Sequence, residues 1–379
     1  MKSFREHDNI LSDLYKANRK IRESRPFDSQ PGHCVYFRGG DLLEISVPCS
    51  RCPHDAEGKC VMCNYGLSEP VISAEQLEQE ALGFIREKGQ GIRKLLLCTN
   101  GATLDPRCVP RPFLDVLLSI AQKCEAEKII IETHLDTINE EILQHIRSVV
   151  TKPVLLELGL ESVDSFVQHY CYMKDIPINR MEEAIRLGKE MGFSFQLNLM
   201  LGAPFLNINE QIEDTENSIR WALDRVDYVT LFPMNIKPYT LLRFAYDSGL
   251  YKQISHWMMA VLLDRFPGDN LMRIDLAWYG NRDIDYGEPT TETIFPVSCN
   301  HCHEKLIQFY EKFNESETAD ARKRIVKDIL TNGETLCDCY ADVLSQIGQA
   351  ADTPLESRAE RVFEQQIKLL HLLKDNRLI

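Results

Sequence analysis

Hydrophobic residues recur along most of this chain in two alternating patterns. Short apolar runs, such as 94–98 and 154–158, have the length of buried strands, and amphipathic stretches, such as 139–149, have apolar residues at helical spacing. Strand and helix alternate with short links, which predicts parallel strands joined by right-handed crossovers. Strands are expected at 41–47, 94–98, 128–132, 154–158, 194–201, 228–232 and 272–277, and helices at 73–88, 112–124, 139–149, 180–191 and 209–223.

About six such units fit a partial TIM-like (β/α)6 barrel better than a complete barrel of eight, so the expected fold class is α/β. We expect an amphipathic N-terminal helix within residues 1–33, the barrel over 34–298, and a helical C-terminal extension over 299–379. Functional residues in such barrels lie where the strands end. The search for a site therefore concentrates on the carboxyl ends of the predicted strands.

The loop after the first predicted strand contains four cysteines, Cys49, Cys52, Cys60 and Cys63. Thiolates are the soft ligands that iron and zinc prefer. A closed zinc site takes four protein ligands, whereas three cysteines on a 4Fe-4S cluster leave one iron open to another ligand. The loop by itself permits either a zinc knuckle that uses all four cysteines or a cluster held by the last three.

Other strands end in polar or glycine-containing segments, each a weak signal alone. Asn100 and Gly101 follow the second strand, but Asn-Gly is also common in plain turns. Glu132 ends the third strand, and a carboxylate suits a ribose diol because it accepts two hydrogen bonds, although many such charges are simply solvated. Ser162 follows the fourth strand in a Gly-Leu-Glu-Ser segment, and Asn198 lies in the fifth.

The spacing Cys52-x7-Cys60-x2-Cys63 resembles the cluster loop of radical S-adenosylmethionine (SAM) enzymes. The resembling branch contains the Elongator catalytic subunit and, with greater likeness, the radical SAM subunit of archaeosine synthase. The resemblance to that subunit covers roughly residues 35–340, including Ala203-Pro204-Phe205-Leu206. The chain departs from it after the Gly-Leu-Glu-Ser segment, where Tyr-Met-Lys-Asp at 172–175 replaces an expected Asn-Lys-Gly.

The resemblance implies two cofactors, a 4Fe-4S cluster and SAM. The cluster would be bound by Cys52, Cys60 and Cys63, with Cys49 as a bystander. In these enzymes the reduced cluster passes an electron to SAM, and the resulting 5'-deoxyadenosyl radical abstracts a hydrogen from the substrate. An electron donor such as flavodoxin or ferredoxin is therefore an expected partner. By the same resemblance, SAM would contact Asn100, Gly101, Glu132, Ser162 and Asn198.

A second group of cysteines comes late in the chain: Cys299 and Cys302, then Cys337 and Cys339. Four thiolates are a suitable set for tetrahedral structural zinc, which is the favoured interpretation. A second iron-sulfur cluster and unligated thiols stay open as alternatives. His301 and His303 are reserve ligands.

Composition limits the partners. The formal net charge is -14, and no cluster of basic residues is evident, so stable nucleic-acid binding is not expected and a small-molecule substrate is favoured. Thirteen cysteines without a signal sequence indicate metal ligation in a reducing compartment rather than a disulfide framework. With no apolar run long enough to cross a bilayer, the expectation is a cytoplasmic protein that does not use a membrane.

The resemblance also directs the choice of substrate. Archaeosine synthase breaks a C-N bond in the side arm of a 7-deazaguanine, and a bacterial relative, queuine lyase, breaks the analogous bond of free queuine. The acidic composition favours the free modified nucleobase, with His134, Phe232 and Asn235 as its predicted contacts. A radical enzyme that modifies a 7-deazaguanine in tRNA, and a non-enzymatic zinc-stabilised binding or redox-sensing protein, are the alternatives.

Overall fold

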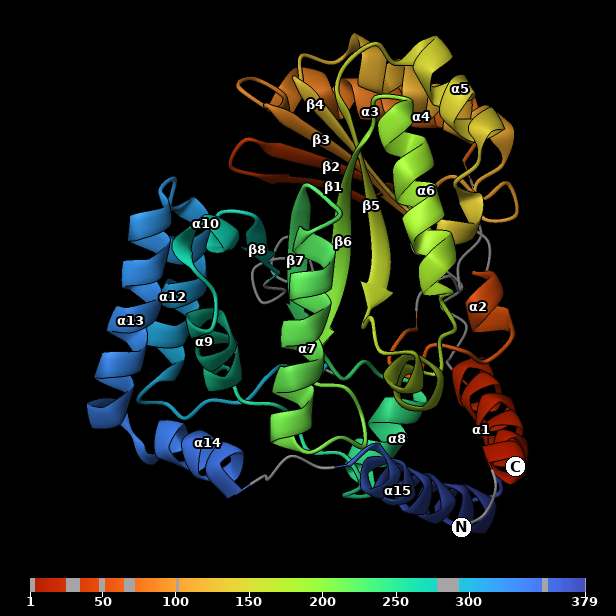
Figure 1. Ribbon diagram of the computed structural model, residues 1–379. Helices are drawn as coiled ribbons and strands as arrows, with labels where there is room; N and C mark the ends of the chain where they lie inside the picture. Colours follow the sequence, from red (N-terminus) through yellow and green to blue (C-terminus); the bar gives the residue numbers. More distant parts are fainter. Residues whose placement is uncertain are drawn as a thin grey trace.

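The computed structural model describes residues 4–24, 35–47, 52–64, 72–99, 102–277, 293–349 and 354–378. Their strands form a single sheet ordered from β1 to β8 (Figure 1). β1 is antiparallel to β2, and the seven strands β2 to β8 are parallel and curl into a half-barrel. The predicted α/β partial barrel is confirmed. The strands are β1 (Val35–Gly39), β2 (Leu42–Val47), β3 (Lys94–Thr99), β4 (Lys128–Thr133), β5 (Val154–Glu161), β6 (Ser194–Leu201), β7 (Tyr228–Pro233) and β8 (Ile274–Leu276).

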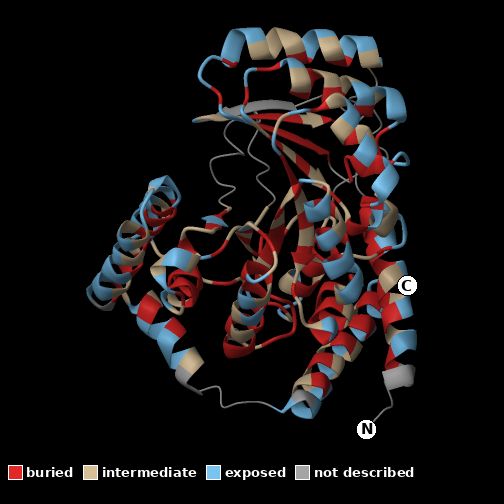
Figure 2. Cartoon of the chain, turned by 45° about the horizontal axis from the view of Figure 1, so that its top comes forward, coloured by how far each residue is buried: buried red, intermediate tan, exposed pale blue. Residues whose placement is uncertain are grey.

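Five helices cover the outer face of the half-barrel, and the buried residues concentrate between them and the sheet (Figure 2). The contact is close at Gly188, where an added Cβ would lie 2.3 Å from the ring of Phe195. The first of these helices starts with a capping box, in which Ser73 and Gln76 satisfy each other's backbone N–H groups. The five helices are α3 (Ala74–Lys88), α4 (Arg111–Lys123), α5 (Glu140–Val149), α6 (Ile178–Glu190) and α7 (Ile208–Leu223).

Burial alternates along β4 to β7 because successive side chains of a strand point to opposite faces. In β4, Ile129 and Ile131 are buried under the helices, whereas Ile130 and Glu132 on the other face are partly exposed. This second face, here called the inner face, is largely polar at the ends of the strands. Its residues are Glu44, Cys98, Glu132, Glu157, Gln196, Asn198, Thr230 and Phe232.

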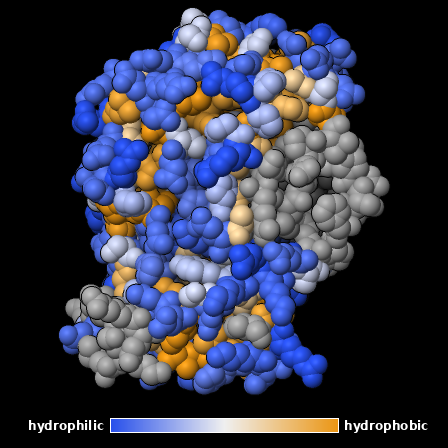
Figure 3. Space-filling view, turned by 90° about the vertical axis from the view of Figure 1, so that its right-hand side faces the viewer, coloured by the Kyte–Doolittle hydropathy of each residue, from blue (hydrophilic) through white to orange (hydrophobic). Residues whose placement is uncertain are grey.

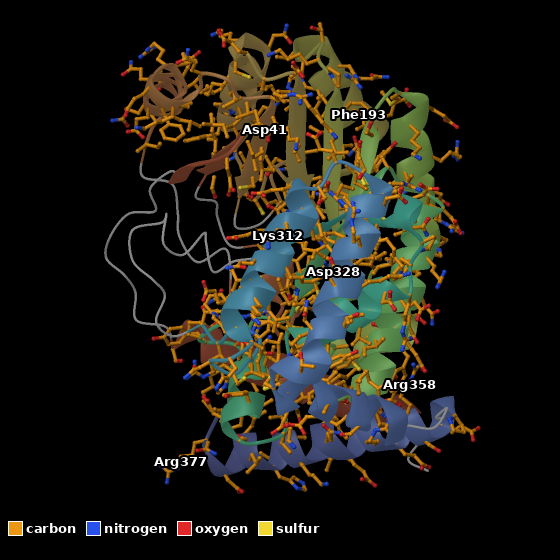
Figure 4. The ribbon with its side chains drawn as sticks, turned by 90° about the vertical axis from the view of Figure 1, so that its left-hand side faces the viewer. Asp41, Phe193, Lys312, Asp328, Arg358 and Arg377 are labelled. Carbon is orange, nitrogen blue, oxygen red and sulfur yellow. The ribbon has the colours of Figure 1, made fainter. Side chains whose placement is uncertain are left out.

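Helices also fill the C-terminal part of the chain, where α12 and α13 run side by side and α15 crosses below them (Figure 4). α15 packs against α1 (Phe4–Glu23), and the ring of His7 stacks on Phe363 with 3.6 Å between ring centroids. The remaining helices are α2 (Pro53–Ala56), α8 (Leu241–Asp247), α9 (Trp257–Asp264), α10 (Gly268–Leu271), α12 (His303–Glu315), α13 (Ala319–Leu336), α14 (Asp338–Gln349) and α15 (Leu355–Asp375).

One face of the molecule is mostly polar. On this face, shown in Figure 3, hydrophilic side chains predominate, and hydrophobic ones form smaller areas between them. Within the described ranges, no helix has both the length and the apolar character that a bilayer crossing requires.

Candidate cofactor site at the carboxyl ends of the strands

The cysteine loop lies across the carboxyl ends of the strands, because its backbone bonds to segments that follow other strands. The N–H of Cys60 donates to the carbonyl of Met173 at 2.9 Å, and that of Val61 to Tyr172 at 3.0 Å. The carbonyl of Val61 in turn accepts from the N–H of Leu242 at the start of α8. The loop is thus tied both to the chain after β5 and to the chain after β7.

Helix α1 clamps the same loop from outside. The buried guanidinium of Arg22 donates to the carbonyls of Lys59, Cys60 and Cys63 at 2.8, 2.5 and 2.6 Å. One turn earlier on α1, Asn18 donates to the carbonyl of Gly58 at 2.9 Å. A buried charged donor with three carbonyl partners fixes the loop far more firmly than a loop's own turns would.

Gly58 is required by this clamp. Its φ is +79°, and an added Cβ would lie 2.1 Å from the carbonyl oxygen of Tyr15. Cys60 also has a positive φ of 60°, and the N–H of Cys63 bonds to its carbonyl at 3.0 Å. The loop therefore turns sharply at Gly58 and again at Cys60.

A buried ion pair adjoins the thiols. Lys174 lies 2.6 Å from Glu161 and also donates to the carbonyl of Gly159. Burial opposes the charge of Lys174, but Glu161 and the thiol of Cys60 together raise its pKa above the ordinary value. Burial raises the pKa of the Cys60 thiol, and Lys174 acts in the opposite direction. Lys174 and Arg22 thus place two positive charges beside a loop that would carry thiolates.

The donor set suits a cluster. The groups of described residues that bring three or more potential ligands within 4.8 Å are Cys299 with its three partners and His54 with His134 and Asp136. Cys52, Cys60 and Cys63 are not such a group, and a 4Fe-4S cluster does not need them to be, because each thiolate binds a different iron. Cys49, the fourth ligand that a zinc knuckle would use, lies outside the described residues.

The inner face beside the loop is acidic and extensively hydrogen-bonded. The thiol of Cys98 donates to Glu44 at 3.2 Å, and Asn198 donates to Glu157 at 2.8 Å. Burial first, and then Glu44 and Glu132, raise the pKa of Cys98 well above that of a free thiol. Three carboxylates, from β2, β4 and β5, thus lie on one face of the sheet.

Three predicted ligand contacts each have a buried polar atom without a hydrogen-bond partner in the described part of the chain. These atoms are Oδ1 of Asn198, Oδ1 of Asn235 and Nε2 of His134. An unsatisfied buried group costs about 1–3 kcal/mol unless a ligand or water pairs with it. Of the other predicted contacts, Glu132 and Phe232 are partly exposed on the inner face, and Asn100 and Gly101 lie outside the described residues.

Ser162 differs from the other predicted SAM contacts because it is fully buried. Its hydroxyl donates to Asp214 at 2.6 Å and accepts from the N–H of Asp164. Burial raises the pKa of Asp214 to about 7, although Ser162 opposes the shift. As placed, the Ser162 side chain serves the packing between β5 and α7 and has no surface for a ligand.

The predicted substrate contact His134 belongs to a cluster that the sequence did not reveal. Its ring lies 4.2 Å from that of His54, and Asp136 lies 3.5 Å from His134 and 3.8 Å from His54. Burial, with smaller effects of His134 and Lys174, lowers the pKa of His54 to about 3, so this imidazole is neutral. The one signal for His54 is its place two residues after Cys52.

The second cysteine group also assembles, with Cys299, Cys302, Cys337 and Cys339 inside one 4.8 Å group. The reserve ligand His303 is engaged elsewhere, with Nδ1 2.6 Å from the hydroxyl of Ser298.

No protein-family model matches the chain. Over 321 residues it is 22% identical to MJ0550 of Methanocaldococcus jannaschii, an uncharacterised protein, and the match covers 81% of this chain and 85% of that one. Among solved structures, it is similar to archaeal Elp3 from Methanocaldococcus infernus, with a TM-score of 0.50 and 15% identity. That match covers 73% of this chain and 64% of Elp3. Queuine lyase from Clostridium spiroforme, bound to SAM and queuine, matches at a TM-score of 0.40 and 15% identity over 54% of this chain and 81% of its own.

The comparisons bear on the fold. The chain has the partial-barrel fold of the radical SAM enzymes, and its cysteine loop lies at the end of the barrel where the strands terminate. The likeness to queuine lyase is too low to bear on the substrate.

Proposed function

We propose that this protein is a radical SAM lyase that cleaves the C-N bond in the side arm of free queuine and releases 7-aminomethyl-7-deazaguanine. The single observation that carries the proposal is the position of the Cys52, Cys60 and Cys63 loop, which is bonded to the segment after β5 beside an acidic inner face. These three cysteines would hold the cluster. The motif resemblance to archaeosine synthase supports a 7-deazaguanine.

The charge of the inner face supports an amine-bearing substrate. Glu44, Glu132 and Glu157 lie on β2, β4 and β5, on one face of the sheet, and Glu157 accepts a hydrogen bond from Asn198 at 2.8 Å. Queuine carries a secondary amine that is protonated at neutral pH, and SAM carries a sulfonium and an amino group. Carboxylates in a site shielded from water favour such cations strongly.

The unpaired amide oxygens support a guanine-like base. The edge of a 7-deazaguanine presents N–H donors, and the free acceptors of Asn198 and Asn235 are the groups that would receive them. Phe232, partly exposed on the same face, offers a flat apolar contact for the ring. The neutral His54 and the neighbouring ring of His134 would provide one further polar contact at the rim of the site.

When bound, the cluster and SAM would supply a carbon radical that removes one hydrogen from the substrate, with the electron coming from a flavodoxin or ferredoxin. The chain's own residues hold the loop rigid, orient the base and exclude water. Arg22 and Lys174 offset the negative charge of the thiolates, and the inner-face carboxylates hold the amine near the hydrogen to be removed.

The test is anaerobic reconstitution with iron and sulfide, followed by SAM, a reductant and queuine. The expected products are 5'-deoxyadenosine and 7-aminomethyl-7-deazaguanine in step with each other, measured by liquid chromatography and mass spectrometry. The Cys60→Ser variant is the control for cluster dependence. Cleavage of SAM that leaves queuine intact would overturn the substrate assignment while keeping the radical chemistry.

The same assay separates the alternatives. Turnover of a 7-deazaguanine in tRNA, with free queuine left intact, would assign the protein to tRNA modification. Reconstituted protein that contains no iron and sulfide would point to the non-enzymatic zinc-stabilised protein. A tRNA gel shift at physiological salt adds an independent measure, because phosphate contacts depend strongly on salt.

A further inference from the structure

Four cysteines that lie far apart in sequence meet at the junction of three C-terminal helices. Cys299 and Cys302 precede and cap α12, Cys337 ends α13, and Cys339 lies in the first turn of α14. One sulfur from each falls within 4.8 Å of all the others, and the sulfurs of Cys299 and Cys302 are 3.6 Å apart. Three of the four, Cys299, Cys337 and Cys339, line a surface pocket together with Leu336, and Cys302 is buried beneath it.

We propose that these four thiolates bind one zinc ion in a closed tetrahedral site. A zinc-sulfur bond of about 2.3 Å places the sulfurs of a tetrahedron roughly 3.8 Å apart, which agrees with the compactness of the group. A sulfur-only set of four is typical of structural zinc. An iron-sulfur cluster would instead spread its thiolates over separate irons.

The surroundings complete the site. Cys302 is fully buried, and the indole N–H of the buried Trp257, which lacks another partner in the described residues, lies within reach of its thiol. Trp257 also packs against Tyr340, one residue beyond Cys339, with ring centroids 5.0 Å apart. Groups outside the ligand set commonly orient metal ligands, and this indole is placed to do so for Cys302.

Histidine is not needed as a ligand. His303 bonds to Ser298, and His301 lines the pocket but is not a member of the four-thiol group. The sulfur-only set therefore leaves no open position for a substrate, so the role of the ion is structural.

The ion would join the C-terminal extension to the barrel. The segment before Cys299 pairs with loops that follow β7, through the bridges Ser255 to Val297 and Ile236 to Ile294. The ion fixes this segment to the ends of α13 and α14, which pack on α9. Because the unfolded chain has no preformed site, the free energy of zinc binding adds to the folding stability of this extension.

The test uses a variant without the first cysteine group, Cys52→Ser/Cys60→Ser/Cys63→Ser, so that the result does not depend on the proposed radical chemistry. Metal content is measured by inductively coupled plasma mass spectrometry after treatment with a chelating resin. We expect about one zinc per chain in this variant and in the wild type. The Cys337→Ser/Cys339→Ser variant should lose the zinc, and Cys124→Ser, in a buried cysteine outside both groups, should keep it.

Cobalt provides a readout on the chain with its four thiols intact. Co²⁺ added to metal-free protein should give the intense thiolate charge-transfer and visible bands of a tetrahedral sulfur site, and zinc should abolish them. Hydrogen exchange in α13 and α14 should slow when zinc is added. Iron with acid-labile sulfide in place of zinc, a disulfide between any two of the four cysteines in freshly purified protein, or an octahedral cobalt spectrum would overturn the proposal.

Discussion

The two cysteine groups of this chain share a Cys-x2-Cys pair but are constructed differently. In the first, Cys60 and Cys63 lie on a loop whose carbonyls are held by Arg22, and their thiols do not meet those of Cys52 at a single point. In the second, all four thiols converge within 4.8 Å at the ends of three helices. The same short motif therefore serves two geometries.

A Cys-x2-Cys pair alone therefore does not determine which metal site it can form. The kind of site depends on where in the chain the remaining ligands come from and on the groups that hold the backbone. A single loop fixed through its carbonyls leaves the thiols separate, as a multi-iron cluster requires. Ligands brought together by the docking of three helices can close around one ion, as structural zinc requires.

Removing one thiol from each group is the most direct test of whether the two groups bind different metals. Cys60→Ser should reduce bound iron from about four per chain to well below one and lower SAM cleavage at least about 100-fold, because three thiolates hold the cluster. Cys302→Ser should reduce zinc instead and leave the iron in place. Iron and SAM cleavage that survive in Cys60→Ser would contradict the assignment. Cys124→Ser is the control.

The next largest effect concerns the ion pair beside the first group. Lys174→Met leaves Glu161 buried without its partner and should lower the free energy of unfolding by about 3–5 kcal/mol in urea titrations of metal-free protein. It should also make the cluster harder to reduce, because a positive charge near the thiolates is lost. The double variant Lys174→Met/Glu161→Gln should recover part of the stability.

The exposed Lys189 on α6 supplies the matched control for Lys174→Met. Lys189→Met should have no measurable effect on the free energy of unfolding or on the reduction of the cluster. A double variant as unstable as the single one would show that the pair does not act as a unit.

Arg22→Met tests whether the hydrogen bonds of Arg22 support only the first cysteine group. Three loop carbonyls lose a charged donor, so the unfolding free energy should fall by about 3 kcal/mol, and iron uptake during reconstitution should slow. The zinc content should not change. Arg19→Met, an exposed position on the same helix, is the control. An equal loss of zinc would mean that the two groups are not independent.

The smallest expected effect tests the packing behind the first group. The pKa of Asp214 is raised from 3.8 to about 7, so the folded protein holds this proton more tightly than the unfolded chain. Asp214 therefore favours folding at acidic pH, and the contribution is lost as the pH rises from about 4 to 7. Asp214→Asn should flatten this dependence, which changes the difference in unfolding free energy between pH 5 and pH 8 by about 2 kcal/mol. An unchanged slope would contradict the raised pKa.

Much of the fold follows from the sequence because apolar runs and amphipathic helices alternate cleanly. The predicted strand 194–201 has the bounds of β6, and the other predicted strands differ from those observed by a few residues. β1 was missed as a separate strand. Its signal was the Gly-Gly-Asp turn at 39–41, where Gly40 has a φ of +56° and the chain reverses into β2.

The sequence pointed to the cysteines of the first loop as candidate ligands, but it did not point to the residues that contact this loop. Arg22 and Lys174 reach Cys60 from segments 38 and 114 positions away, and no local pattern encodes such contacts. Glu161 has a φ of +62°, and the register of β5 shifts between Gly159 and Glu161, just before the buried Ser162. Backbone turns of this kind at a non-glycine residue leave no trace in composition.

The contact between α1 and α15 has a consequence for biosynthesis. His7 and Gln366, 359 positions apart, are hydrogen-bonded at 2.5 Å, and Arg358 on α15 pairs with Asp164 beyond β5. Until α15 has been synthesised, the helix that holds the Cys60 loop lacks this packing partner. We therefore expect the loop to become rigid only after α15 has emerged from the ribosome, which would delay metal insertion until then.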